Sequence, residues 1–197
     1  SGNVVRNLDF NFFNIDRFYT GPYNYEGTNL EVSFQEKRNL GDALLIYGVV
    51  AEDEKTLIEG VRKTINQSHV FSEYLFSDGE KFSFTVSGRA SGHSQFGGSS
   101  TARVNGSYRL PSGTILRSSL GSGYRAPSLY ELFAPYYGNS TLLPETSVTA
   151  DVGFELPIGS NKSSLSATIF ETTISDRIKE CKKIIKSNNL IKIQFYE

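Results

Sequence analysis

The sequence predicts an all-β chain, an antiparallel up-and-down transmembrane β-barrel that is here a partial barrel of about nine strands. Three observations predict this fold class: apolar and polar residues alternate over long segments, short and long connections alternate along the chain, and aromatic residues are abundant. The 197 residues include 14 Phe, 11 Tyr and 18 Gly, but no Trp. Charged residues make up 21% and hydrophobic residues 38%, which excludes both a highly charged disordered chain and a helical membrane protein.

The alternation is clearest at residues 81–90, where Phe82, Phe84 and Val86 share one face and polar side chains occupy the other. The same pattern recurs at residues 8–12, 30–34, 101–110, 146–156 and 165–169. A period of two is typical of strands, because successive side chains point to opposite faces. Segments of roughly 9–11 residues match a tilted membrane strand, whereas strands of soluble sheets average about 5–6 residues.

The connections between these segments differ in length. Short turns are predicted at residues 39–42, 77–80, 110–114 and 157–162, and longer loops at residues 51–66, 91–100 and 123–145. In a meander, successive connections lie at opposite ends of the sheet. The short turns are therefore expected at one end and the long loops at the other. Outer-membrane barrels have this layout, with short periplasmic turns and long outer loops. A soluble β-sandwich binding module, with its apolar face turned inward, is the alternative.

In the membrane interpretation, the apolar face of each strand contacts lipid and the polar face lines a wet lumen. Arg89, Arg103 and Arg109 lie on the polar face, where we expect them to pair with carboxylates such as Asp151 and Glu155. Ordinary salt bridges across the lumen are the default expectation for these residues.

The composition predicts no catalytic residue, no metal site and no cofactor. A net charge of −1 gives no basic surplus for nucleic acid, and one cysteine, Cys181, excludes an internal disulfide and a cysteine-based zinc site. An outer-membrane barrel enzyme, the second alternative, would need His69 or His93 as its base. His93 adjoins Ser94, but neighbours on a strand point to opposite faces. Glu52-Asp53-Glu54 is expected in a solvated loop rather than in a calcium site.

Residues 179–197 abandon the alternation and are rich in Lys, Ile and Asn. We therefore divide the chain into a partial barrel, residues 1–178, and a lysine-rich tail, residues 179–197. The tail is expected to be a short helix, an edge strand or, preferably, an unstructured segment. The chain lacks methionine, so we expect a processed product or a piece of a longer protein.

The most specific stretch is Gly123-Tyr124-Arg125-Ala126-Pro127-Ser128-Leu129-Tyr130-Glu131-Leu132. It resembles the G-[FY]-R-A-P-S-L-x-E-L stretch of TonB-dependent outer-membrane receptors, closest to the cobalamin-receptor-like branch. Gly138-Asn139-Ser140-Thr141-Leu142-Leu143-Pro144-Glu145 resembles that family's G-N-P-x-L-K-P-E segment, with Ser140 and Leu143 in place of Pro and Lys. Upstream, Gly88-Arg89 and His93-Ser94-Gln95-Phe96-Gly97 resemble a further family segment, and the order and spacing of all pieces agree.

The resemblance is clear over residues 81–178 and extends by pattern back to Ser1. It implies part of a Gram-negative outer-membrane receptor that takes up a scarce, bulky nutrient: cobalamin, haem or a ferric siderophore. Its partners would be outer-membrane lipid, the small-molecule ligand, a plug domain and TonB. The plug, the coupling segment and the final strands of the family are not found in this sequence, so a partial receptor is expected.

The resemblance also assigns candidate residues in the longest loop. Arg125, Ala126, Pro127, Pro144 and Glu145 are predicted to be structural, because Pro127 holds Ala126 extended at the base of the loop. Tyr136 and Tyr137 are the candidate ligand-binding residues. An interfacial aromatic girdle or loop packing is the favoured alternative for these two tyrosines.

Overall fold

The computed structural model describes residues 3–18, 24–58, 60–134, 138–159, 163–176, 178, 185–186 and 190–196. These residues form eleven strands and one short helix. In chain order the elements are β1 (Val4–Phe18), β2 (Asn24–Asn39), β3 (Ala43–Ile58), β4 (Val61–Ser77), β5 (Phe82–His93), β6 (Gly97–Arg109), β7 (Ile115–Arg125), α1 (Leu129–Phe133), β8 (Glu145–Ile158), β9 (Ser163–Ser175), β10 (Ile185–Lys186) and β11 (Leu190–Tyr196).

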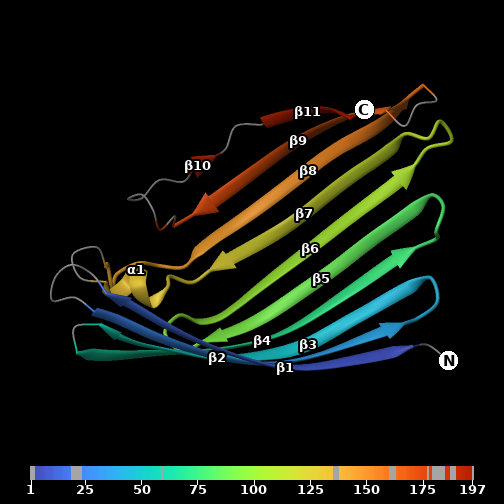
Figure 1. Ribbon diagram of the computed structural model, residues 1–197. Coiled ribbons are helices and arrows are strands. Elements are labelled where there is room, and N and C mark those ends of the chain that lie inside the picture. Colours follow the sequence, from blue (N-terminus) through green and yellow to red (C-terminus); the bar gives the residue numbers. More distant parts are fainter. Residues whose placement is uncertain are drawn as a thin grey trace.

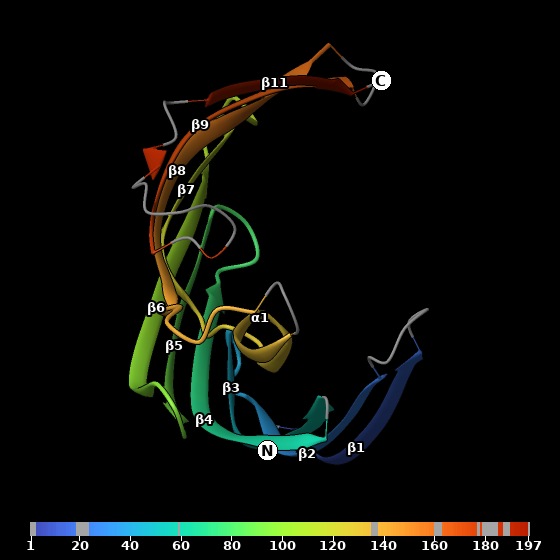
Figure 2. The same cartoon turned by 90° about the vertical axis from the view of Figure 1, so that its left-hand side faces the viewer.

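Strands β1 to β9 form a single antiparallel meander, in which each strand pairs with the next one along the chain. The sheet curves into an open arc, and α1 lies inside that arc (Figures 1 and 2). The prediction of an all-β partial barrel with about nine strands before residue 175 is confirmed. None of the described residues belongs to a helix long and apolar enough to cross a membrane.

The described part of the tail continues the sheet. Both β10 and β11 pair antiparallel with β9, and the β11 register runs from Leu190 opposite Phe170 to Tyr196 opposite Ser164. Of the three expectations for this segment, an edge strand is the one that these described residues adopt.

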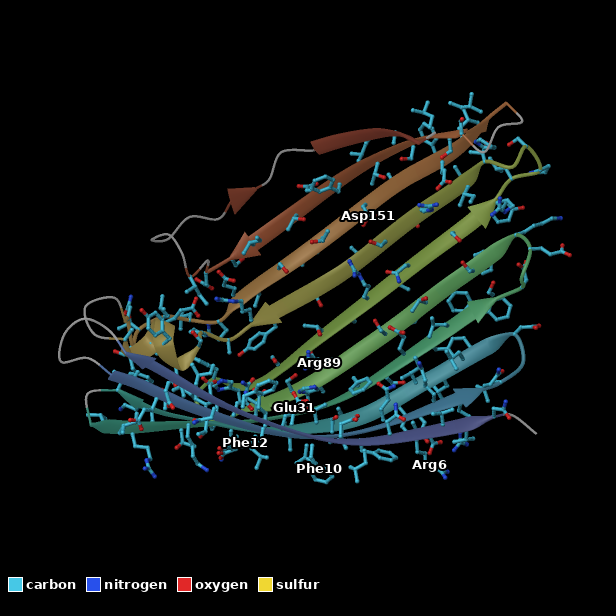
Figure 3. The ribbon with its side chains drawn as sticks, viewed as in Figure 1. Arg6, Phe10, Phe12, Glu31, Arg89 and Asp151 are labelled. Atoms are coloured by element: carbon cyan, nitrogen blue, oxygen red, sulfur yellow. The ribbon has the colours of Figure 1, made fainter. Side chains whose placement is uncertain are left out.

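The strand register divides the side chains into two faces. On the outer, convex face Phe10 lies opposite Val32, Val86 opposite Val104, and Val152 opposite Ile169. Large apolar side chains are freely exposed there: Phe10 is 69% exposed and Val152 is 58% exposed. A soluble sandwich would bury these side chains against a second layer. Figure 3 shows Phe10 and Phe12 on the outside of the arc, with Glu31, Arg89 and Asp151 on its concave side.

Two of the three predicted long loops are wrong. Residues 51–66 are mostly strand, since β3 and β4 pair as far as Ile58 opposite Val61, and Gly60 makes the turn with φ of 78°. Residues 91–100 contain only a three-residue connection, Ser94–Phe96, between β5 and β6. The acidic run Glu52–Glu54 therefore lies in β3, not in a loop.

Strand length explains this error. With 16 residues at about 3.3 Å each, β3 extends for about 53 Å, whereas the apolar band of an outer-membrane barrel is only about 25 Å tall. Beyond Ala51 the outer face becomes polar, with Asp53 and Lys55 as the next outward residues of β3. Both faces are then polar, so the alternation that marks a strand disappears although the strand continues.

Two ends of the sheet can now be distinguished. We call the end with the connections after β2, β4, β6 and β8 the short-turn end. The opposite end, the α1 end, also has short connections after β3 and β5, but it carries in addition the long connection that contains α1 (Figure 1). Aromatic rings cluster on the outer face near the short-turn end, where the Phe84 ring lies 5.5 Å from Phe76, 5.7 Å from Phe82 and 5.9 Å from Tyr74. Such a group is typical of an interfacial aromatic girdle.

Candidate functional site

The helix α1 begins at a complete capping box. Ser128, the N-cap, accepts a hydrogen bond from the Glu131 backbone N–H, while the Glu131 carboxylate accepts one from the Ser128 N–H at 2.9 Å. This reciprocal pair satisfies backbone donors that a helix start leaves free. The helix has only five residues, so contacts with the sheet must supply most of its stability.

Those contacts form a small core on the concave side of the sheet. Leu129 and Leu132 of α1 are 1% and 2% exposed and pack with Ile65 of β4, which is 2% exposed. Phe96, Phe133 and Leu142 border this cluster, and the Lys63 ammonium lies 4.6 Å from the centre of the Phe133 ring. The longest connection of the chain therefore folds back over the inner face instead of standing free in solvent (Figure 2).

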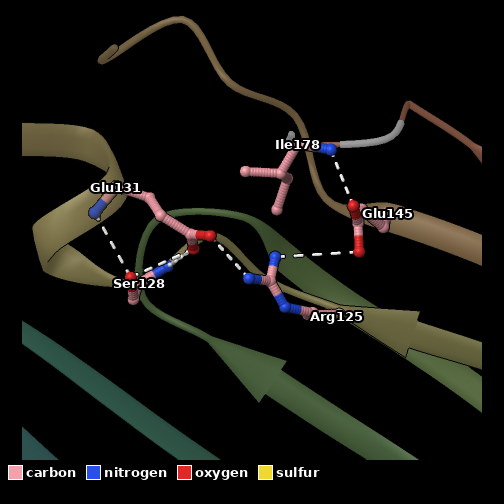
Figure 4. Close-up of polar contacts among 5 residues, drawn as sticks. All are labelled: Arg125, Ser128, Glu131, Glu145 and Ile178. Atoms are coloured by element: carbon pink, nitrogen blue, oxygen red, sulfur yellow. Dashed lines mark hydrogen bonds and ion pairs between the residues drawn. The ribbon is translucent and has the colours of Figure 1, made fainter. Parts of the chain in front are cut away.

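Arg125, the last residue of β7, joins both ends of this connection. Its guanidinium contacts the Glu131 carboxylate of α1 at 2.5 Å and the Glu145 carboxylate, at the start of β8, at 3.7 Å (Figure 4). Glu145 also accepts a hydrogen bond from the Ile178 backbone N–H at 2.6 Å. We call Arg125, Ser128, Glu131 and Glu145 the α1 clamp.

The clamp determines the ionisation of Glu131. Partial burial on its own would raise the pKa of this carboxyl group, but hydrogen bonds from Ser128 and the nearby Arg125 charge outweigh burial and lower it. Glu131 is therefore a carboxylate at neutral pH, as the ion pair with Arg125 requires.

The Gly138-Asn139 pair closes the loop against the end of α1. The Gly138 N–H donates to the Ala134 carbonyl at 2.7 Å, and a Cβ at Gly138 would lie 2.6 Å from the Ala134 nitrogen. Only glycine tolerates this approach without a backbone shift. The Asn139 N–H donates to the Glu131 carbonyl, and its side-chain oxygen accepts from the Thr141 N–H at 2.9 Å.

His93 and Ser94 lie at the turn between β5 and β6, next to the core around Phe96. His93 is 7% exposed, its ring lies 4.9 Å from the Phe96 ring, and its Nδ1 accepts N–H groups of Gln95 and Phe96. The Ser94 hydroxyl accepts the Asn66 N–H at 3.1 Å. The two side chains thus shape the β5–β6 turn and tie it to β4, and neither contacts the other in a nucleophile–base arrangement.

The concave face carries a band of polar pairs. Arg89 Nη2 lies 2.6 Å from His69 Nε2, Asn11 donates to Glu31 at 3.1 Å, and Asn29 donates to Glu52. Further round the arc, Arg117 pairs with Glu155 and Ser119 donates to Asp151. Glu155 and Asp151 thus do have partners on the polar face, but their partners come from β7 rather than from Arg89, Arg103 or Arg109.

Of the five predicted loop residues, Arg125 and Glu145 belong to the clamp, and Ala126, Pro127 and Pro144 are next to clamp residues in the chain. Arg125 and Glu145 are in contact, Pro127 is fully buried just before the N-cap of α1, and Pro144 is half-buried just before β8. Ala126 is half-buried between Arg125 and Pro127. Tyr136 and Tyr137 lie outside the described residues. Their proposed ligand contact stays a prediction.

Sequence reasoning missed Ser128 and Glu131 as members of the site. The signal was present, because Ser-x-x-Glu before an apolar run is the capping-box pattern. It also missed Ile65, and here no local signal existed, since a buried position on an alternating strand looks the same whichever segment covers it. Within the described part of the chain, no group of three or more His, Cys, Asp or Glu side chains is arranged to hold a metal ion.

Comparison with known proteins agrees with this architecture. The family model described as TonB dependent receptor-like, beta-barrel, matches residues 2–181. The iron-regulated outer membrane virulence protein of Vibrio cholerae serotype O1 is 26% identical over 155 residues, which cover 71% of this chain and 24% of that protein. The vitamin B12 transporter BtuB of the same species is 25% identical over 108 residues, 54% of this chain and 18% of the transporter. The chain thus spans about a quarter or less of these relatives' length.

Solved structures share the fold at low sequence identity. The siderophore receptor PirA from Pseudomonas aeruginosa superposes with a TM-score of 0.69 at 20% identity, covering 77% of this chain and 32% of that receptor. A mutant of the ferric enterobactin receptor PfeA from the same organism gives a TM-score of 0.72 at 18% identity, over 88% of this chain and 32% of the receptor. Both of these structures are named as receptors. With the family model matching most of its length, the chain belongs to the TonB dependent receptor-like β-barrel family.

Proposed function

We propose that the chain forms part of the barrel wall of a Gram-negative outer-membrane receptor that imports a scarce, bulky nutrient with energy supplied through TonB. The observation that carries the proposal is the arrangement of the two faces: a freely exposed apolar outer face, and a polar concave face onto which the α1 connection folds. A lipid-facing wall around a wet passage requires this arrangement. The same exposed apolar face argues against a soluble β-sandwich, which would bury such side chains.

We propose a ferric siderophore as the first substrate class. The relative that covers more of the chain is named as iron-regulated, and siderophore receptors share the fold. Cobalamin is the second candidate, supported by the similarity to the vitamin B12 transporter. In either case the concave face would meet the ligand or the plug, and the chain would act in transport rather than as an enzyme.

The α1 clamp has a structural part in this proposal. It holds the connection inward, so that α1 narrows the passage at the end of the sheet opposite the short turns. That end faces the outside in outer-membrane barrels. Tyr136 and Tyr137 belong to the same connection, which supports the proposal that they contact ligand at the outer mouth. Residues 1–178 would act as barrel and residues 179–197 as an addition to its edge.

The test is uptake by cells that lack the complete protein containing this chain. We expect them to lose uptake of one labelled probe among a ferric catecholate siderophore, haem and cyanocobalamin, and to keep the other two. Restoring the gene should restore uptake, and collapsing the proton gradient should abolish it. Unchanged uptake of all three probes in the deletion strain would contradict the proposal.

A further inference from the structure

Four side chains form a charged cluster on the outer face, beside the large apolar side chains Leu8 and Phe34. Glu36 of β2 accepts hydrogen bonds from Arg6 Nε at 2.8 Å, from Arg38 Nε and Nη2 at 3.0 and 2.6 Å, and from the Tyr47 hydroxyl at 2.7 Å. The whole residue is only 4% exposed. We call Arg6, Glu36, Arg38 and Tyr47 the outer-face cluster.

The register places this cluster on the outer face near the short-turn end. Arg6 lies opposite Glu36, and the next outward pair on the same strands is Leu8 opposite Phe34. Arg38 stands one residue before the end of β2. Figure 3 shows Arg6 on the same side of the sheet as Phe10 and Phe12, displaced from them toward the short turns. The cluster therefore sits at one margin of the apolar band.

The aromatic residues mark this margin as the level of lipid headgroups. Tyr47 belongs to the cluster itself, and its neighbour on the outer face of β3, Leu45, lies opposite Tyr74 of the girdle described above. Tyrosine rings concentrate where the hydrocarbon meets the headgroups, because one end is apolar and the other polar. At the opposite end the strands β3 and β4 extend beyond the apolar band and the long α1 connection is found, which is the elaboration typical of the outer side of such barrels. The lipids next to the cluster therefore belong to the periplasmic leaflet.

The cluster carries a positive charge that no acidic side chain within it neutralises. Two guanidinium groups and one carboxylate leave a formal charge of +1. Glu36 is already saturated, since its two oxygens accept four hydrogen bonds from three side chains. Each guanidinium carries five N–H donors, and Glu36 uses only Nε of Arg6 and Nε and Nη2 of Arg38. The arginine side chains remain 64% and 45% exposed, so free donors face the headgroup level.

We propose that the outer-face cluster binds the phosphate of an anionic phospholipid in the periplasmic leaflet. Glu36 holds the two guanidinium groups in fixed positions, which reduces the entropy lost when their remaining N–H donors engage a phosphate. Guanidinium forks match phosphate oxygens in geometry as well as in charge. A zwitterionic headgroup supplies the same phosphate but offsets it with an ammonium group, so an anionic lipid is the fitting occupant. The proposal rests on the membrane location proposed above and is independent of the nutrient.

The experiment uses the complete outer-membrane protein that contains this chain, purified in detergent and titrated with phosphatidylglycerol or phosphatidylethanolamine under native mass spectrometry. We expect one phosphatidylglycerol to be retained in preference to phosphatidylethanolamine. The test variant is Arg6→Gln with Glu36→Gln and Arg38→Gln, which keeps polar side chains of similar size and leaves no unpaired buried carboxylate. A basic charge near a membrane surface contributes roughly a fivefold gain in anionic-lipid affinity, so removing the cluster's net charge of +1 should weaken phosphatidylglycerol binding at least about fivefold, and the loss of both guanidinium forks should weaken it further.

Two further variants separate the binding site from a general charge effect. Arg103→Gln with Arg109→Gln removes two arginines from the opposite, concave face and should leave phosphatidylglycerol affinity unchanged. Arg6→Lys with Arg38→Lys keeps the charge without the fork and should retain part of the affinity. Equal affinity of the native protein for the two lipids, or wild-type affinity in the triple variant, would overturn the proposal. Absence of any retained phosphatidylglycerol in the native protein would overturn it as well. Failure of the membrane location would show differently, as a protein that is folded and monomeric in buffer without detergent.

Discussion

The tight turn after β4 and the α1 connection after β7 bring the chain round at opposite ends of the sheet by different means. In the turn, Asp78 makes most of the side-chain hydrogen bonds: its Oδ1 accepts the backbone N–H groups of Glu80, Lys81 and Phe82 at 2.8–2.9 Å, and the neighbouring Ser77 hydroxyl accepts that of Gly79. In the α1 connection, Arg125 and Glu145 come from two strands, and the buried leucines of α1 rest on Ile65 from a third strand. The first device is local in sequence and the second is tertiary.

This difference indicates where a substitution should have a local effect and where it should disturb several strands at once. The turn depends on residues within four positions of Asp78, so its loss should stay local. The α1 connection couples β4, β7 and β8, so damage to any of them should release the same helix. Four changes test this contrast, in decreasing order of expected effect.

The largest effect is expected for Leu132→Ala. Leu132 is 2% exposed in the α1 core, and truncating a buried leucine costs about 2–5 kcal/mol. A five-residue helix cannot absorb that loss, so α1 should detach from the sheet. Hydrogen exchange of residues 126–134 in the complete membrane protein measures this. Leu143→Ala is the matched control, because Leu143 belongs to the same connection but is 60% exposed. Equal exchange in the two variants would show that α1 does not depend on its core.

Arg125→Gln should release α1 to a smaller extent. The side chain is 47% exposed, so solvent screening limits its ion pairs to about 1–2 kcal/mol of docking free energy. Exchange should rise at α1 and also near Glu145, because one guanidinium serves both. Arg117→Gln, which removes the cross-strand partner of Glu155, is the control and should leave α1 protected. If exchange became faster at α1 but not near Glu145, the ion pair between Arg125 and Glu145 would make no contribution to holding the connection.

Asp78→Ala should loosen only the β4–β5 turn. The three backbone N–H groups lose their shared acceptor, so exchange should accelerate at Glu80, Lys81 and Phe82 while α1 stays unchanged. Asp78→Asn retains a side-chain oxygen and should give an intermediate rate. A change in α1 exchange in either variant would contradict the local character of the turn.

The smallest effect is a pH dependence shared by both ends. Hydrogen bonds from the backbone of Phe82, Glu80 and Lys81 lower the pKa of Asp78, and contacts with Ser128 and Arg125 lower that of Glu131 despite burial. A carboxyl group whose pKa is lower in the folded state stabilises it above the unfolded pKa, about 4, and loses that contribution as the pH falls through the folded value. Protection at both sites should therefore decline below about pH 4. Asp78→Asn should abolish this decline only at the turn, and Glu131→Gln only at α1.

The sequence predicted those parts of the fold that its local chemistry encodes. The Asp78-Gly79 turn has its signal in consecutive residues, and Phe82, Val104 and Val152 show the period of the exposed apolar face directly. The outward extensions of β3 and β4 escaped prediction, because period-two patterning detects a strand only while its two faces meet different environments. Asp53 and Lys55 meet water on the outside, as Glu52 and Glu54 do on the inside.

The candidate site was predictable only in part for a related reason. The motif around Arg125 and Glu145 marked the connection as special, and Ser128 with Glu131 carried a capping signal. The partner surface on β4 carried none: Ile65 follows the strand alternation as any inward residue would. Which strand receives α1 depends on the curvature of the whole sheet, and no local pattern encodes that curvature.

The meander has a consequence for the order of assembly. Each strand from β2 to β9 hydrogen-bonds to the one made just before it, so the sheet can grow by successive hairpins with little loop entropy lost at each step. The packing of Leu129 and Leu132 on Ile65 is the exception, since it joins segments separated by three intervening strands. In a sheet that grows strand by strand, this contact forms after β5, β6 and β7 have paired. We therefore expect α1 to dock late in folding and not to be part of the folding nucleus.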